Sequence, residues 1–227
     1  MPYIILLIAV FLLLLGPQWW VQRVMQRYHV RPEANFPGNG SELARHLLNR
    51  FNLHNVKVEV TESGDHYDPA TLAVRLTADK FNGRSLTAIT TAAHEVGHAM
   101  QHAADEPMLR WRTRLVVIAS ASQKLGSFLL FAAPLLTLVT RAPSAGAITL
   151  LAAFLIMGMN VLVQLLTLPV ELDASFNKAL PVLKAGYLTP EQIKGARQIL
   201  RAAAFTYLSA SLAGLLNFWR WLQVLKR

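Results

Sequence analysis

Four runs of apolar residues divide the chain, and the segments between them are richer in polar and charged residues. The first run covers residues 3–21, the second extends from about 115 to 140, and the third from about 145 to 168. Each is long enough to cross the hydrocarbon core of a bilayer as a helix, which takes about 20 residues. A fourth run, roughly 202–219, is shorter and more polar, so it either spans the membrane or lies partly in the interface. The pattern predicts a multi-pass membrane protein.

The charged residues that border these runs predict their orientation. Arg23, Arg27 and Arg31 directly follow the first run. By the positive-inside rule, the amino terminus then faces outward and the segment after the run faces the cytoplasm. Only residues 141–144 separate the second and third runs, which predicts a helical hairpin with a short external loop.

The polar segment after the first run has the periodicities of a small folded domain. Residues 41–52 place apolar side chains on one side of a helix, and the patterns at 56–60 and 72–76 predict two strands. Ser85 is a suitable N-cap for the next helix. The predicted division is a transmembrane anchor at 1–21, a catalytic domain at 22–114, a transmembrane hairpin at 115–169, a cytoplasmic segment with a metal ligand at 170–201, and a transmembrane or interfacial helix at 202–227.

Composition narrows the classes of function. The 227 residues include no cysteine, so a disulfide framework and thiolate metal ligands are excluded, and a metal would have to bind His, Asp or Glu. The formal net charge of +9 would usually suggest nucleic acid or an anionic surface as the partner. Here the basic residues border apolar runs, which is what membrane topology produces. We therefore expect the lipid bilayer as a partner, and no nucleic acid.

The most informative local pattern is His94-Glu95-Val96-Gly97-His98. On a helix, the HExxH spacing places both imidazoles on one face, where they can bind one zinc ion with Glu95 beside its open coordination position. A carboxylate there can take a proton from a zinc-bound water, whose pKa the metal lowers to about 7. The alternative is an ordinary helix that carries two histidines. Gly97 favours the metal site, because a glycine inside a helix costs about 1 kcal/mol and close approach of another backbone would explain it.

A catalytic zinc usually has three protein ligands and a water. His102 continues the histidine spacing, but it would lie about 12 Å from His94 along the helix axis, too far to share one ion readily. The positions three and six after His98 hold Gln101 and Ala104 rather than glycine and histidine, which excludes a metzincin.

Two carboxylates, Glu171 and Asp173, follow the third apolar run. Acidic side chains at the end of a membrane segment are costly without a function or a partner, although they could simply mark the interface. The predicted hairpin returns the chain to the side that carries His94 and His98. We therefore choose Glu171 as the third ligand and expect Asp173 to orient one of the histidines.

The expected mechanism is zinc-assisted hydrolysis of a peptide bond, with Glu95 as general base and then as proton donor to the leaving amine. The developing oxyanion needs a further donor. The candidates are His66, Tyr67, Arg201 and Tyr207. Tyr207 is the first choice, although an interfacial tyrosine at the mouth of a membrane helix is an equally good interpretation of it.

Residues 65–69, Asp-His-Tyr-Asp-Pro, carry more polar groups than a plain turn needs. They either form the rim of a cleft beside a strand that pairs with an extended substrate, or make an Asx-type turn ended by Pro69. Since Pro69 has no backbone donor, pairing would have to use the strand beyond it. Both interpretations stay open at this point.

Several motifs together resemble a bacterial family of membrane neutral zinc metallopeptidases, often called YugP-like. They are DHYDP at 65–69, RL at 75–76, AAHEVGHAMQ at 92–101, TLPVELDAS at 167–175 and AAAFTY at 202–207. The resemblance implies a multi-pass, zinc-dependent endopeptidase of the gluzincin type in the bacterial cell membrane. It implies His94 and His98 as ligands, Glu95 as base and Glu171 as third ligand. Many related gluzincins have an aspartate four residues after that glutamate, where this chain has Ser175.

The expected fold is a mostly α membrane protein, with about four transmembrane helices and a small α+β, zincin-like metallopeptidase domain at the cytoplasmic membrane face. We expect one zinc ion per chain, and membrane or juxtamembrane proteins as substrates. Two alternatives belong to other classes. An intramembrane metalloprotease would need about 20 apolar residues around the motif, and the flanking residues are too polar for that. A non-enzymatic adaptor with structural zinc would have no use for Glu95.

Overall fold

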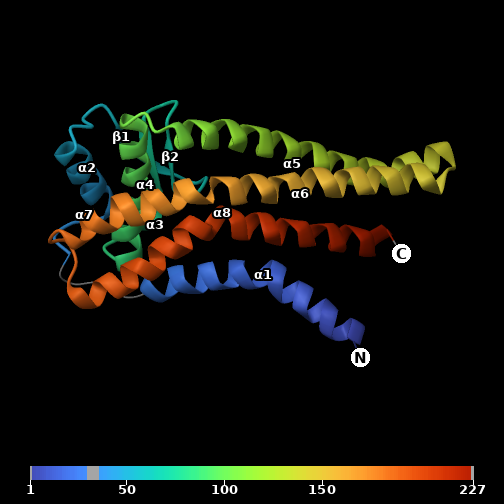
Figure 1. Ribbon diagram of the computed structural model, residues 1–227, viewed down its shortest axis with the longest axis horizontal. Coiled ribbons are helices and arrows are strands. Elements are labelled where there is room, and N and C mark those ends of the chain that lie inside the picture. The colour runs from blue at the N-terminus through green and yellow to red at the C-terminus, as the bar shows by residue number, and fades with distance from the viewer. Residues whose placement is uncertain (1, 30–35, 226–227) are drawn as a thin grey trace. The chain divides into compact units, whose positions relative to one another are not determined.

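The computed structural model describes the backbone of residues 2–29 and 36–225, and the side chains as far as residue 213. The chain is predominantly helical and includes one small sheet (Figure 1). It forms two compact units. The first comprises the chain up to Trp19, the segment Trp111–Leu168 and the chain from Thr206 onward; the second comprises Trp20–Arg110 and Pro169–Phe205.

The first unit consists of long apolar helices. Three helical stretches in the described part of the chain are long and apolar enough to cross a membrane, namely Tyr3–His29, Pro107–Thr140 and Pro143–Lys184. Their apolar side chains are largely exposed in the isolated chain, as lipid-facing side chains would be. The helices that contribute are α1 (Pro2–His29), α5 (Pro107–Thr140), α6 (Pro143–Asp173) and α8 (Pro190–Leu225).

Helices α5 and α6 lie side by side and are joined by a short connection (Figure 1). A Cβ added at Gly126 would lie 2.7 Å from the side chain of Met157, so the two helices approach closely at this point. The side-chain amide of Asn160 donates to Gln123 across the same contact at 3.4 Å. The fourth expected span falls in α8, where the side chains beyond residue 213 lie outside the description.

The second unit packs helices around a three-stranded sheet. The strands are ordered β1-β3-β2, with β1 parallel and β2 antiparallel to the central β3. The elements are α2 (Gly40–Arg50), β1 (Lys57–Thr61), β2 (His66–Asp68), β3 (Ala73–Thr77), α3 (Ala78–Phe81), α4 (Leu86–Ala103), the π-helix η1 (Ala174–Ala179) and α7 (Leu180–Lys184).

Most local elements follow the sequence pattern. The predicted helix at 41–52 is α2, which begins with a capping box between Asn39 and Glu42 and buries its leucines. The two predicted strands are β1 and β3, each shifted by one residue. Neither interpretation of residues 65–69 included a strand of their own, but His66–Asp68 form the edge strand β2, in which Tyr67 is paired with Val74.

Helix α4 is the centre of the second unit. It begins at the predicted N-cap Ser85, whose hydroxyl accepts a hydrogen bond from the backbone of Ala88 at 3.1 Å. Fifteen of its 18 residues are buried, against α2, the sheet, η1 and α7. It is not among the candidate membrane spans of the described residues. The HEVGH motif therefore lies on a helix enclosed by protein.

Candidate metal centre

The two segments that carry the predicted metal ligands are in direct backbone contact. A Cβ built on Gly97 would lie 2.7 Å from the carbonyl oxygen of Ala174, the first residue of η1. Only glycine permits that distance, since real Cβ atoms essentially never approach so closely. The expected close approach of another backbone to the HEVGH helix is confirmed, and it brings the end of α6 against α4.

His94, His98 and Glu171 converge in the interior of the second unit and are exposed by 3%, 2% and 2%. One potential ligand atom from each lies within 4.8 Å of the others. The Oε2 atom of Glu171 lies 3.1 Å from His98 Nε2 and 3.5 Å from His94 Nε2. Two atoms that bind a tetrahedral zinc ion at about 2.0–2.1 Å are about 3.3 Å apart. The two separations from Glu171 bracket that value, so the three residues could hold a zinc ion.

The far nitrogen of each imidazole is also held by a buried side chain. Ser175 Oγ lies 3.0 Å from His94 Nδ1 and donates to the carbonyl oxygen of Leu200 at 3.1 Å. Gln101 Oε1 lies 2.9 Å from His98 Nδ1. Metal-binding histidines are commonly held in this way, because the second nitrogen then fixes the orientation of the ring.

Asp173 reaches the site through Gln101. The amide nitrogen of Gln101 donates to Asp173 Oδ2 at 2.8 Å and to the carbonyl oxygen of Val170 at 3.1 Å. The other carboxylate oxygen of Asp173 accepts from Asn177 at 2.7 Å. The aspartate therefore touches Gln101 rather than a histidine.

An ion pair also links the two segments that carry the predicted ligands. Lys178 of η1 lies 2.7 Å from Glu106, which follows α4. Each partner is about one quarter exposed, so this pair adds orientation more than stability.

His102 is not a ligand of the predicted group. Its Nδ1 atom lies 2.7 Å from the hydroxyl of Tyr67, which joins the edge strand β2 to α4. Burial, together with the neighbouring charge of Asp68, raises the pKa of Tyr67 to about 12. The phenol therefore stays protonated near neutral pH and its oxygen is engaged by His102.

The two aspartates of the DHYDP segment have structural partners. Asp68 accepts hydrogen bonds from the backbone of Ala70 and from the Thr71 hydroxyl, which is the Asx-type turn that we considered. Asp65 accepts from Thr77 and pairs with Lys80 at 2.9 Å.

The expectation that a substrate could pair with the strand beyond Pro69 is wrong, because that strand, β3, is central and is paired on both sides. Both β3 and the edge strand β2 pack against α4.

The other candidate oxyanion donors lie in different surroundings. His66 Nδ1 is 2.8 Å from the carbonyl oxygen of Gly64. Arg201 is exposed on α8. Tyr207 belongs to the first unit, where the guanidinium carbon of Arg112 lies 5.6 Å from the centre of its ring. The role of Tyr207 as oxyanion donor stays a prediction.

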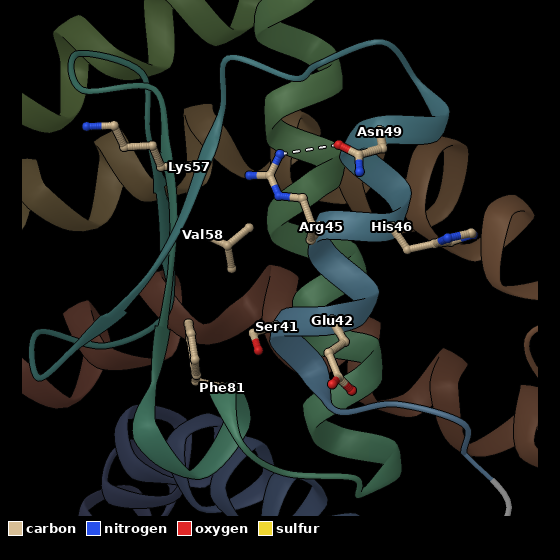
Figure 2. Close-up of a pocket in the computed structure, with 8 residues that line it drawn as sticks. All are labelled: Ser41, Glu42, Arg45, His46, Asn49, Lys57, Val58 and Phe81. Atoms are coloured by element: carbon tan, nitrogen blue, oxygen red, sulfur yellow. Dashed lines mark hydrogen bonds between the residues drawn. The ribbon is translucent and has the colours of Figure 1, made fainter.

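A groove of about 710 Å³ lies between α2 and β1 (Figure 2). Arg45 crosses it and is hydrogen-bonded to Asn49. None of its lining residues belongs to the histidine and glutamate group. The lining residues are Ser41, Glu42, Arg45, His46, Asn49, Lys57, Val58 and Phe81.

Comparison with known proteins identifies the family. A sequence profile of the family described as "Putative neutral zinc metallopeptidase" matches residues 3–226. The chain belongs to this family. It is 32% identical over 227 residues to the Bacillus subtilis (strain 168) protein named "Putative membrane protease YugP", covering 99% of this chain and 96% of that protein. No solved structure gives a significant match.

The family description names zinc, and the second unit provides three residues that could hold a metal ion. Sequence reasoning missed the contact between Gln101 and His98. The sequence contained an indication of this contact, because a polar residue three positions after His98 lies on the same helix face. Ser175 had been noted only as a departure from the aspartate of related gluzincins, and it lies against His94.

Proposed function

We propose that the protein is a membrane-bound, zinc-dependent endopeptidase, with His94, His98 and Glu171 as the metal ligands. The observation that carries the proposal is the meeting of the HEVGH histidines with a buried carboxylate from a segment 73 residues further along the chain. Their separations suit a tetrahedral ion. A buried carboxylate and two imidazoles with no ion would be a costly arrangement to maintain.

Each residue of the site has its own role in the proposed reaction. When bound, the zinc ion would polarise the scissile carbonyl and lower the pKa of a bound water to about 7. Glu95 follows a ligand histidine on α4 and is 5% exposed, so its carboxylate lies in a largely water-excluded site. It accepts a proton from the attacking water and delivers it to the nitrogen of the leaving amine. The two histidines and Glu171 would hold the metal ion.

We propose membrane or juxtamembrane segments of proteins as the substrate class. Glu171 follows Leu168, the end of the third apolar run, by three residues. The relative from Bacillus subtilis carries "membrane protease" in its name. An extended peptide could add to the free edge of β2, whose backbone lies next to α4. The arginines after the first run support a cytoplasmic face for the site.

The two alternatives have less support. An intramembrane metalloprotease would carry the motif on a spanning helix, whereas α4 is enclosed by the second unit and is not a candidate span among the described residues. A zinc-binding adaptor would retain the ligands without needing the carboxylate of Glu95. The following experiment distinguishes a zinc-binding adaptor from a peptidase.

Replacement of Glu95 by glutamine tests the mechanism. The purified full-length protein, in detergent with zinc, would be assayed on fluorescein-labelled casein, and membrane proteomes of cells carrying each form would be compared. Since the amide lacks the base but leaves the ligands intact, Glu95→Gln should keep one zinc per chain and lose cleavage by about 10²–10⁴-fold. The exposed Glu62→Gln serves as the matched control and should retain activity. Equal cleavage by Glu95→Gln and the unaltered protein would exclude Glu95 as the base.

A further inference from the structure

The hydrogen bonds around Ser175 determine which nitrogen of His94 carries a proton. The carbonyl oxygen of Leu200 can only accept, so the Ser175 hydroxyl must donate its one proton to it. The same hydroxyl oxygen can then only accept from His94 Nδ1, 3.0 Å away. In this arrangement His94 is protonated at Nδ1, and in its neutral form the lone pair is on Nε2.

The same reasoning applies to His98 through a different side chain. Both partners of the Gln101 amide nitrogen are acceptors, namely the carbonyl oxygen of Val170 and the carboxylate of Asp173. The amide oxygen of Gln101 therefore faces His98 Nδ1, at 2.9 Å, and accepts its proton. His98 is also protonated at Nδ1.

Both Nε2 atoms consequently face the same carboxylate oxygen, and a cation between them would receive both lone pairs. The Nε2 atoms of His94 and His98 lie 3.5 Å and 3.1 Å from Glu171 Oε2. We infer that Ser175 and Gln101 are positioning residues that fix both imidazoles in the Nδ1–H form, so that three electron-pair donors converge on one cation. This inference rests on the proposed metal centre and adds two residues to it.

Gln101 has a second effect that Ser175 lacks. It bonds to Val170 and Asp173, the residues that flank Glu171 and Leu172 on α6, while its oxygen holds His98 on α4. One buried side chain, 1% exposed, thus connects a histidine ligand to the backbone and side chain on either side of the carboxylate ligand. The position of Glu171 relative to the histidines depends on this connection.

Zinc affinity of the full-length protein in detergent tests the inference, measured by competition with a chromogenic chelator. Ser175→Ala and the nearly isosteric Gln101→Met each remove the acceptor of an Nδ1 proton, and each should weaken zinc binding about 10–100-fold. Ser175→Thr keeps the hydroxyl and should recover most of the loss. Ser209→Ala is the matched control, because Ser209 is equally buried and donates to a backbone carbonyl, but in the first unit. It should bind zinc normally.

A second measurement detects which nitrogen of each histidine carries a proton. In the zinc-free protein, side-chain ¹⁵N resonances of histidine distinguish a protonated nitrogen from one with a lone pair. The unaltered protein should show Nδ1 protonated for both His94 and His98, whereas the Nε2 atoms share a proton with Glu171 as long as zinc is absent. Ser175→Ala should change this pattern at His94 only, and Gln101→Met at His98 only. If Ser175 and Gln101 had only a structural role, their substitution would alter stability without changing the protonation pattern of one particular histidine.

The outcomes separate this inference from the proposed function. Normal zinc affinity and unchanged ¹⁵N patterns in folded Ser175→Ala and Gln101→Met proteins would overturn the positioning role and leave the metal centre intact. Absence of zinc binding by the unaltered protein would overturn both. A circular dichroism spectrum of each variant establishes that it is folded before either measurement is interpreted.

Discussion

Gly97 shows how one missing side chain permits the candidate metal centre. Its hydrogen takes the place of a Cβ that would meet the backbone oxygen of Ala174 at 2.7 Å. Backbone atoms of a packed helix cannot rotate away as a flexible side chain can, so the helices would have to separate. Because Ala174 lies between Glu171 and Ser175, any separation would displace both groups from the histidines.

We expect Gly97→Ala to reduce both stability and zinc affinity. The added methyl group overpacks the contact, which typically costs about 1–3 kcal/mol. Gly158→Ala on α6 is the matched control, since an added Cβ there meets nothing within 4 Å and alanine favours a helix. Thermal unfolding in detergent and chelator competition would measure the two effects. Gly97→Ala with unchanged zinc affinity would show that the close approach does not set the ligand geometry.

At the scale of elements, one arginine connects all three strands of the sheet. Arg75 on the central β3 lies 2.7 Å from Asp68 on β2 and 3.2 Å from Glu59 on β1. Burial alone would raise the pKa of Asp68, but hydrogen bonds from Thr71, the Ala70 backbone and Arg75 outweigh it and hold the pKa below its ordinary value. The charged form of Asp68 therefore stabilises the folded sheet.

The stabilisation by Asp68 should depend on pH. Its pKa is lower in the folded than in the unfolded chain, so its contribution is complete above the unfolded value of about 3.9 and is lost as the pH falls through the folded value. Asp68→Asn should accordingly unfold at a lower temperature than the unaltered protein at pH 7. The difference should shrink as the pH is lowered from 5 to 3. A difference in unfolding temperature that stays constant over this range would contradict the assignment.

At the scale of the whole molecule, the apolar helices and the metal centre belong to separate units, each with its own packing. The predicted topology places the connection between α5 and α6 outside the cell and the second unit in the cytoplasm. The absence of cysteine makes this accessible to experiment, because one introduced cysteine is then the only thiol in the chain.

Accessibility of single cysteines to a membrane-impermeant maleimide would test the topology. Ser144 and Glu62 are both exposed, the first beside the α5–α6 connection and the second in the loop after β1. Ser144→Cys should be labelled in intact spheroplasts, since it faces outward. Glu62→Cys should be labelled only after lysis. The reverse pattern would place the metal centre on the outer side.

Local features of the second unit could be predicted because they depend on neighbouring residues. The spacing of apolar residues predicted α2, β1 and β3, and Ser85 marked the start of α4. Strand β2 was missed because three residues are too short for a periodicity, and its pairing with β3 depends on the burial of Tyr67. The contact of Ser175 with His94 and the contacts of Gln101 with Val170 and Asp173 could not be predicted, because they depend on where α6 ends against α4.

By itself, the sequence determined the chemistry that is available: two imidazoles one turn apart, an adjacent carboxylate, no thiol, and apolar runs of membrane length. Those features follow from helix geometry and side-chain type. Only the tertiary structure decided that Glu171 faces the histidines while Asp173 contacts Gln101, and that neutral Ser175 holds the outer nitrogen of His94. The physical reason is that these contacts join segments more than 65 residues apart, whose meeting depends on the packing of whole helices.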